Sequence, residues 1–182
     1  AEETMSSAID LLKGKMGKKS IISNRPECAT FEEFLCEHAR VPTSGGNYGR
    51  YTFKRREALL EVVRIVDYII NNKVKGATLS LAGGAQFGKT ILELNLAAYA
   101  TSQRFLNFGL FLPDTDLVAG VIDTKFRPDV VDQIPWFAQM VNIGSAVNLS
   151  GKAVNRKGAF VVTDGKRRSI GMAIGLQKIP TT

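Results

Sequence analysis

The sequence predicts an α/β domain in which a mainly parallel sheet is flanked by helices. A short apolar run at 78–82 passes through a glycine-rich loop into a helical pattern over 89–104. A second apolar run follows at 107–112, and an amphipathic helical pattern over 57–71 precedes the first. Strand, crossover helix and strand form a βαβ unit, in which the crossover is nearly always right-handed and the strands lie parallel.

The composition fits one such domain. The chain has 182 residues, of which 45% are hydrophobic and 23% are charged, as expected for a folded globular protein. We expect residues 30–182 to form the domain and residues 1–29 to form a partly flexible basic arm. A solvated arm is favoured over one that touches DNA phosphates.

The net charge of +7 favours a polyanionic partner without identifying one. No apolar run approaches the ~20 residues that span a bilayer, and the N-terminus has no signal-peptide core, so we expect a cytoplasmic protein. Cys28, Cys36 and His38 are too few and too irregularly spaced to indicate a zinc site. We expect both cysteines to be thiols that serve as small core or surface residues.

In the first half of the chain, Thr30 and Glu33 have the spacing of a capping box, which predicts a helix to about Ala39. Turn-forming residues then predict an exposed loop over 41–49. The helix over 57–71 places Leu59 and Val63 on an apolar face, which we expect to pack on the sheet.

The second half begins with a helix from Asp114 or Thr115 to about Lys125. A second short helix is predicted over 127–133 and is closed by 135–137. Strand-like runs at 146–149 and 159–163 predict a hairpin, and the residues after it, 164–169, are basic.

The loop before the long helix carries the main functional signal. Gly83, Gly88, Lys89 and Thr90 fill the fixed positions of G-x-x-x-x-G-K-[ST], the Walker A motif. The loop residues expected to surround the phosphates of ATP through their backbone N–H groups are Gly83, Gly84, Ala85, Gln86, Phe87 and Gly88. Lys89 would contact the β- and γ-phosphates, and Thr90 would bind Mg²⁺. The alternative is a glycine-rich turn before an ordinary helix.

Aromatic and arginine residues upstream of the loop are candidates for contact with the adenine. Tyr51, Phe53 and Arg56 lie where P-loop ATPases often place such a group. For Phe53, a core position that anchors the next helix is the commoner outcome. Gln86 is a candidate for γ-phosphate contact, and a role in packing the loop is equally consistent with its position.

From Phe31 to Thr182 the chain resembles the ATPase portion of a phage terminase large subunit. The resemblance rests on the loop 84–90, on 112–115, and on the Arg127-Pro128 and 134–136 patterns. It implies an additional-strand, RecA-like P-loop fold and a homo-oligomeric ring on a portal protein in the host cytoplasm. It also implies double-stranded DNA as the translocated polymer, a small terminase subunit as partner, and a separate C-terminal nuclease domain.

The sequence shows no Asp-Glu pair after an apolar run, which ATP hydrolysis in this class requires for Mg²⁺ binding and water activation. The closest match ends at Asp164, but Gly165 follows it, and Asp123 is a weaker candidate. We expect the missing strand beyond Thr182. In the alternative, Asp164 would serve as a makeshift magnesium ligand. The chain alone would then turn over little or no ATP.

In terminases, an arginine shortly before that missing strand is thought to act in a neighbouring subunit's nucleotide site. Arg168, rather than Arg167, matches this position because Ser169 follows it. A solvated basic turn is the alternative. Two other functions remain open for the chain: a helicase-like or recombinase-like ATPase, and a nucleotide-binding assembly module without hydrolysis.

Overall fold

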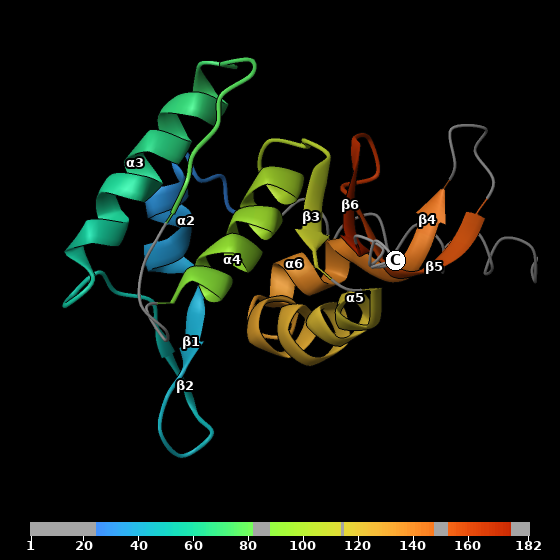
Figure 1. Ribbon diagram of the computed structural model, residues 1–182, viewed down its shortest axis with the longest axis horizontal. Helices are drawn as coiled ribbons and strands as arrows, with labels where there is room; N and C mark the ends of the chain where they lie inside the picture. The colour runs from blue at the N-terminus through green and yellow to red at the C-terminus, as the bar shows by residue number, and fades with distance from the viewer. Residues whose placement is uncertain (1–24, 82–87, 114, 148–152, 176–182) are drawn as a thin grey trace, which may run out of the picture.

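The computed structural model describes residues 25–81, 88–113, 115–147 and 153–175. A long helix, α4 (Lys89–Ser102), lies between two parts of the fold (Figure 1). On one side are α2 (Phe31–Glu37), α3 (Glu57–Asn71) and a hairpin of β1 (Arg40–Pro42) and β2 (Tyr48–Arg50). On the other side are a four-stranded sheet and the remaining helices. Residues 1–24, most of the predicted arm, lie outside the described residues.

The helices of the first half form where the sequence predicts them. Thr30 is the N-cap of α2, and its Oγ1 accepts a hydrogen bond from the Glu33 N–H at 3.1 Å. The Glu33 carboxylate accepts from the Ala29 N–H at 2.6 Å. The bounds of α3 agree with the predicted 57–71, but α3 packs mainly on α2, whereas the sequence predicted packing on the sheet.

The prediction of an exposed loop over 41–49 was wrong in part. Arg40–Pro42 pairs antiparallel with Tyr48–Arg50, and only the connecting turn is without a strand. The turn closes through the Thr43 N–H, which donates to the Asn47 carbonyl at 2.8 Å. Turn-forming residues at this position predict the turn of the hairpin but give no signal for the short strands beside it.

The sheet contains β3 (Phe108–Leu112), β4 (Val141–Val147), β5 (Ala153–Thr163) and β6 (Arg168–Gly175), in the order β3-β6-β5-β4. A hairpin is present as the antiparallel pair β4–β5, but its register differs from the prediction, because residues 159–163 pair with the start of β4 and residues 155–158, expected as a connection, belong to β5. In the basic stretch, residues 164–167 form a turn, and Arg168 and Ser169 begin β6. Within the described residues only β3 and β6 pair in parallel, so this sheet is mixed, in contrast to the mainly parallel sheet expected.

The strand predicted at 78–82 is not formed. Residues 77–81 have no strand pairing, and Leu79 is 41% exposed. The parallel partner of β3 is instead β6, which follows it by more than fifty residues. β3 stands at the edge of the sheet, but residues 77–81 do not pair with it, which shows that an apolar run alone does not make a strand.

The two helices predicted over 114–133 are one continuous helical segment. Helix α5 (Thr115–Val121) continues into a π-helix, η2 (Ile122–Val131), which contains Pro128. Proline cannot donate a backbone hydrogen bond and crowds the preceding turn, but wider winding leaves room for it. The Asp132 N–H bonds to the Arg127 carbonyl five residues back at 2.9 Å. Pro135 begins α6 (Pro135–Met140), where proline at the first helical position is favourable.

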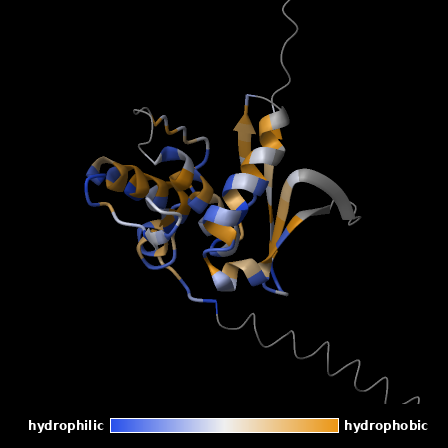
Figure 2. Ribbon diagram, turned by 90° about the horizontal axis from the view of Figure 1, so that it is seen from below, coloured by the Kyte–Doolittle hydropathy of each residue, from blue (hydrophilic) through white to orange (hydrophobic). Residues whose placement is uncertain are grey.

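The apolar core is continuous through α4. The Tyr99 ring on α4 lies 5.3 Å from Phe31 and 5.7 Å from Phe34, and on the sheet side Phe126 lies 4.6 Å from Phe160. Figure 2 shows hydrophobic and hydrophilic residues alternating along the helices, as expected when one helical face is buried. None of the described helices has the length and apolar character needed to cross a membrane.

Candidate functional site

The N-terminus of α4 opens onto a cleft of about 520 Å³, which is within the usual size range for small-molecule sites. Four separate segments line it. They are β1, the residue before α3, the first turns of α4, and η2. The lining residues are Val41, Pro42, Arg56, Gly88, Lys89, Thr90, Ile91, Leu94, Lys125 and Asp129.

Gly88 determines how α4 begins. It has a left-handed backbone conformation, with φ of 88°, which favours glycine. Gly88 has no side chain with which to cap the helix, and the first turn of α4 lines the cleft, so the positive end of the helix faces it. An anion in the cleft would therefore meet backbone N–H groups as well as side chains.

Three cationic side chains converge on this helix end from different elements: Arg56, Lys89 and Lys125. The Arg56 guanidinium lies 3.5 Å from the point where a Cβ on Gly88 would stand. One turn further along α4, burial raises the pKa of Glu93 and the nearby Lys89 ammonium acts against that rise. Among the described residues that line the cleft, Asp129 is the single carboxylate against three cationic side chains, so this part of the lining carries more positive than negative charge.

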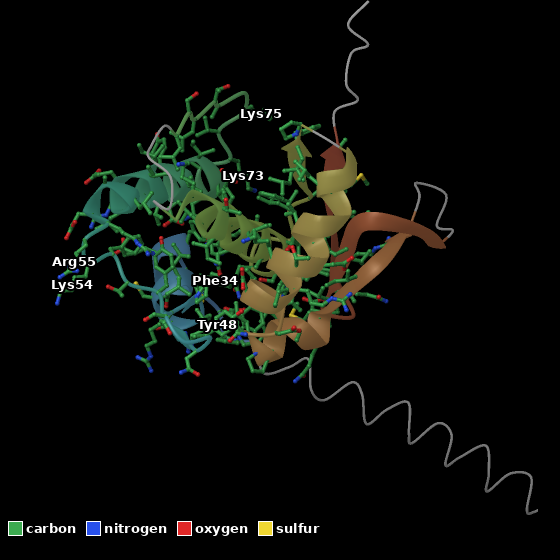
Figure 3. The ribbon with its side chains drawn as sticks, turned by 60° about the horizontal axis from the view of Figure 1, so that its bottom comes forward. Phe34, Tyr48, Lys54, Arg55, Lys73 and Lys75 are labelled. Atoms are coloured by element: carbon green, nitrogen blue, oxygen red, sulfur yellow. The ribbon has the colours of Figure 1, made fainter. Side chains whose placement is uncertain are left out.

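Asp129 is held by a residue of the β1–β2 hairpin. Its Oδ1 accepts a hydrogen bond from the Tyr48 hydroxyl at 2.8 Å. This bond raises the pKa of Tyr48, and partial burial adds to the rise. Tyr48, labelled in Figure 3, therefore connects the hairpin to η2 across one wall of the cleft.

The predicted site residues divide into three groups. Arg56, Gly88, Lys89 and Thr90 line the cleft. Residues 83–87, which include Gly83, Gly84, Ala85, Gln86 and Phe87, lie outside the described residues. Tyr51, Phe53 and Arg168 are described but do not line it.

Tyr51 and Phe53 belong to the core instead. Tyr51 is 2% exposed, and its ring lies 5.3 Å from Phe53 in an edge-on arrangement. Burial raises the pKa of Tyr51, with the charge of Arg56 opposing the rise. The two rings thus support the segment from which Arg56 reaches the cleft.

Asp164, the closest sequence match to a catalytic carboxylate, makes its hydrogen bonds and its ion pair within the turn between β5 and β6. It accepts hydrogen bonds from the N–H groups of Lys166 and Arg167 at 2.9 and 2.7 Å, and pairs with the Arg167 guanidinium at 3.0 Å. Burial acts to raise the pKa of Asp164, but these bonds outweigh it and hold the pKa below its usual value. It does not line the cleft.

The same turn distinguishes the two candidate arginines. The Arg167 guanidinium is paired with Asp164 and lies 4.2 Å above the Phe105 ring. Arg168 is exposed at the start of β6, and in the described part of the chain it takes part in no ion pair.

Sequence reasoning missed Lys125, Asp129 and Tyr48. No local signal could have identified them, because each belongs to an element that meets α4 only in the folded chain. Comparisons with protein-family models, with curated proteins and with solved structures found no match. A function for the cleft is therefore inferred from its own geometry and charge, together with the resemblance carried by its motif.

Proposed function

We propose that the cleft binds Mg²⁺-ATP and that the chain is the ATPase part of a viral DNA-packaging motor. The observation that carries nucleotide binding is that Arg56, Lys89 and Lys125 all line the cleft at the N-terminus of α4. A triphosphate is a polyanion of the size that such a cleft accepts, and charge-assisted hydrogen bonds from several directions would hold it.

In this proposal Lys89 contacts the β- and γ-phosphates and Thr90 offers its hydroxyl to Mg²⁺. Both residues stand in the first turn of α4, and both line the cleft. Arg56 and Lys125 would neutralise further phosphate charge. Asp129, in η2, also lines the cleft and contributes a carboxylate.

The coupling to DNA rests on the terminase resemblance. This part of the proposal includes translocation of double-stranded DNA, a homo-oligomeric ring, contact with a portal protein and a small terminase subunit, and action in the host cytoplasm.

The exposure of Arg168 supports a role toward a neighbouring subunit, since Arg167 is already paired with Asp164. Mixing Arg168→Ala with Lys89→Ala subunits of the full-length motor tests this role. Absence of any rescue or poisoning pattern in ATPase activity would remove it.

A nucleotide-binding assembly module without hydrolysis is the second candidate. Hydrolysis in this class requires one carboxylate to bind Mg²⁺ and another to activate water. Among the described residues that line the cleft, Asp129 is the single carboxylate, which favours this second candidate. We expect this 182-residue chain to bind ATP and to turn over little or none of it. A steady-state ATPase of ordinary rate that depends on Lys89 would contradict that expectation.

The decisive experiment is a titration of the purified chain with a fluorescent ATP analogue in the presence of Mg²⁺. Lys89→Ala should weaken binding by about 10- to 100-fold, the equivalent of one lost hydrogen bond between charged groups. Lys75→Ala is the matched control, because Lys75 is exposed near the far end of α3 and does not line the cleft (Figure 3). Equal binding by both variants, or no binding by the parent chain, would refute the proposal.

A further inference from the structure

A second group of side chains lies outside the cleft, around α2. The ligand atoms of Cys28, Glu37 and His38 all lie within 4.8 Å of one another. The His38 Nε2 atom is 3.8 Å from the Glu37 carboxylate. Cys28 precedes α2, whereas Glu37 is its last residue and His38 its C-cap.

Two of the three, Cys28 and His38, are held by their surroundings. The Cys28 N–H donates to the Gln103 side-chain carbonyl at 3.3 Å, which fixes the backbone beside α4. The His38 ring packs edge-on against Phe34 at 5.8 Å and against Trp136 at 5.5 Å. Such preorganisation reduces the ordering that a bound ion would otherwise require.

One polar atom of this group has no hydrogen-bond partner. His38 Nε2 is buried and has no hydrogen-bond partner. Cys28 is a free cysteine that is 2% exposed. A buried ring nitrogen without a partner costs free energy, and a metal ion is one species that would supply the missing interaction.

We propose that Cys28, Glu37 and His38 bind one Zn²⁺ ion, with water in the fourth position. Thiolate, imidazole and carboxylate are all zinc ligands, and three protein ligands with one water form a known tetrahedral arrangement. Magnesium prefers oxygen ligands and would not compete for the sulfur. This site is independent of the proposed nucleotide cleft.

The geometry requires only a small closure. Zinc–ligand bonds of about 2.0–2.3 Å place tetrahedral ligands about 3.3–3.8 Å apart. The ligand atoms, now within 4.8 Å, would need to move by about 1 Å or less. The Glu37 side chain is 58% exposed, so the ion and its water have access from solvent.

The thiolate is the form of cysteine that binds zinc, so zinc binding by Cys28 would displace the thiol proton to solvent.

The bound ion would join the segment before α2 to the end of that helix. The same segment contacts the end of α4, where the Gln103 side-chain amide donates to the Pro26 carbonyl at 3.1 Å. Zinc binding should therefore stabilise the packing of α2 on α4 and raise the melting temperature of the chain.

The test uses the full chain, with any affinity tag removed, titrated with Zn²⁺ alone by calorimetry and with Co²⁺ by absorption spectroscopy. We expect one ion per chain, a thiolate-to-cobalt charge-transfer band, and a higher melting temperature with zinc. His38→Gln and Glu37→Gln should each weaken binding by at least about 10-fold. Cys28→Ser should abolish the charge-transfer band.

Cys36→Ser is the matched control, because Cys36 is an exposed thiol outside the group. It should keep the stoichiometry, the band and the stabilisation. Because Cys28 is buried, its variant is compared with His38→Gln and Glu37→Gln after circular dichroism has shown each to be folded. The proposal is overturned if the parent chain binds no ion, if folded His38→Gln and Glu37→Gln bind as tightly as the parent, or if Cys36→Ser removes the band.

Discussion

The Arg56 guanidinium lies against the backbone of Gly88, with its Nη1 atom 3.5 Å from the point where a Cβ would stand. Arg56 is the residue before α3, and Gly88 is the N-cap of α4. This approach brings a fixed positive charge to a helix N-terminus that also carries Lys89. The proposed binding of ATP in the cleft depends on that juxtaposition.

Gly88→Ala should therefore reduce both stability and ATP binding. An alanine at a φ of 88° is strained by about 1–2 kcal/mol, and relief of the strain would turn the first turn of α4 away from Arg56. Gly76→Ala is the control, since Gly76 has a φ of 67° with open space around it. Chemical denaturation should show a lower free energy of unfolding for both variants, whereas the titration should show weaker ATP binding only for Gly88→Ala. Full ATP affinity in a folded Gly88→Ala chain would contradict this account.

Lys125→Ala should lower the affinity for ATP without altering the fold. Lys125 is exposed on η2 and lines the cleft, so its ammonium would contribute to binding mainly through charge. We expect a loss of about 3- to 10-fold that diminishes as salt is added, because exposed charges are screened. Lys166→Ala, in the exposed turn after β5, should leave the affinity unchanged. An equal effect of the two substitutions would show that only net charge matters.

Asp67→Ala should destabilise the packing of α2 on α3. The Asp67 carboxylate on α3 accepts hydrogen bonds from the Phe31 and Glu32 N–H groups at 2.5 and 3.3 Å, and so caps the first turn of α2. Its removal leaves the buried Phe31 N–H without this acceptor, at a cost of about 1–3 kcal/mol in unfolding free energy. Glu61→Gln on the same helix removes only an exposed ion pair with Arg64 and should change stability by less than about 0.5 kcal/mol.

The stability contributed by Asp67 should also depend on pH. Burial raises the pKa of Asp67 above 3.8, although the hydrogen bonds from Phe31 and Glu32 oppose the rise. The folded chain thus holds this proton more tightly than the unfolded chain does. The contribution is full below pH 3.8 and is lost as the pH rises through the folded-state pKa. The difference in unfolding free energy between the parent and Asp67→Ala should therefore shrink as the pH rises, and a difference that grows would contradict the sign.

Gly171→Ala should disrupt the sheet core. Gly171 on β6 pairs with Phe160 on β5, and a Cβ on Gly171 would overlap the Phe160 ring. That ring is 2% exposed and cannot move freely because Phe126 lies 4.6 Å away. Overpacking of this kind costs about 1–3 kcal/mol. Gly109→Ala on β3, where the nearest side-chain atom is at an ordinary contact distance, should be nearly neutral in the same thermal unfolding assay.

Local patterns predicted the helices well and the sheet less well. The cap at Thr30 and the apolar spacing of 57–71 are short-range signals, and α2 and α3 follow them. The run at 78–82 is also apolar, yet residues 77–81 form no strand, although β3 stands at the edge of the sheet and pairs only with β6 among the described strands. Strand pairing is decided by which edges meet, and a window of sequence does not contain that information.

The sequence by itself determined the Gly88-Lys89-Thr90 motif, its place at the start of a helix and the basic character of the chain, since these depend on residue type and local spacing. Only the tertiary structure decided that Arg56, Lys125 and Asp129 share a cleft with that motif, and that Cys28 meets His38. Those residues come from segments distant along the chain or at opposite ends of one helix. Packing of the apolar faces around α4 brings them together, and no local propensity encodes such a meeting.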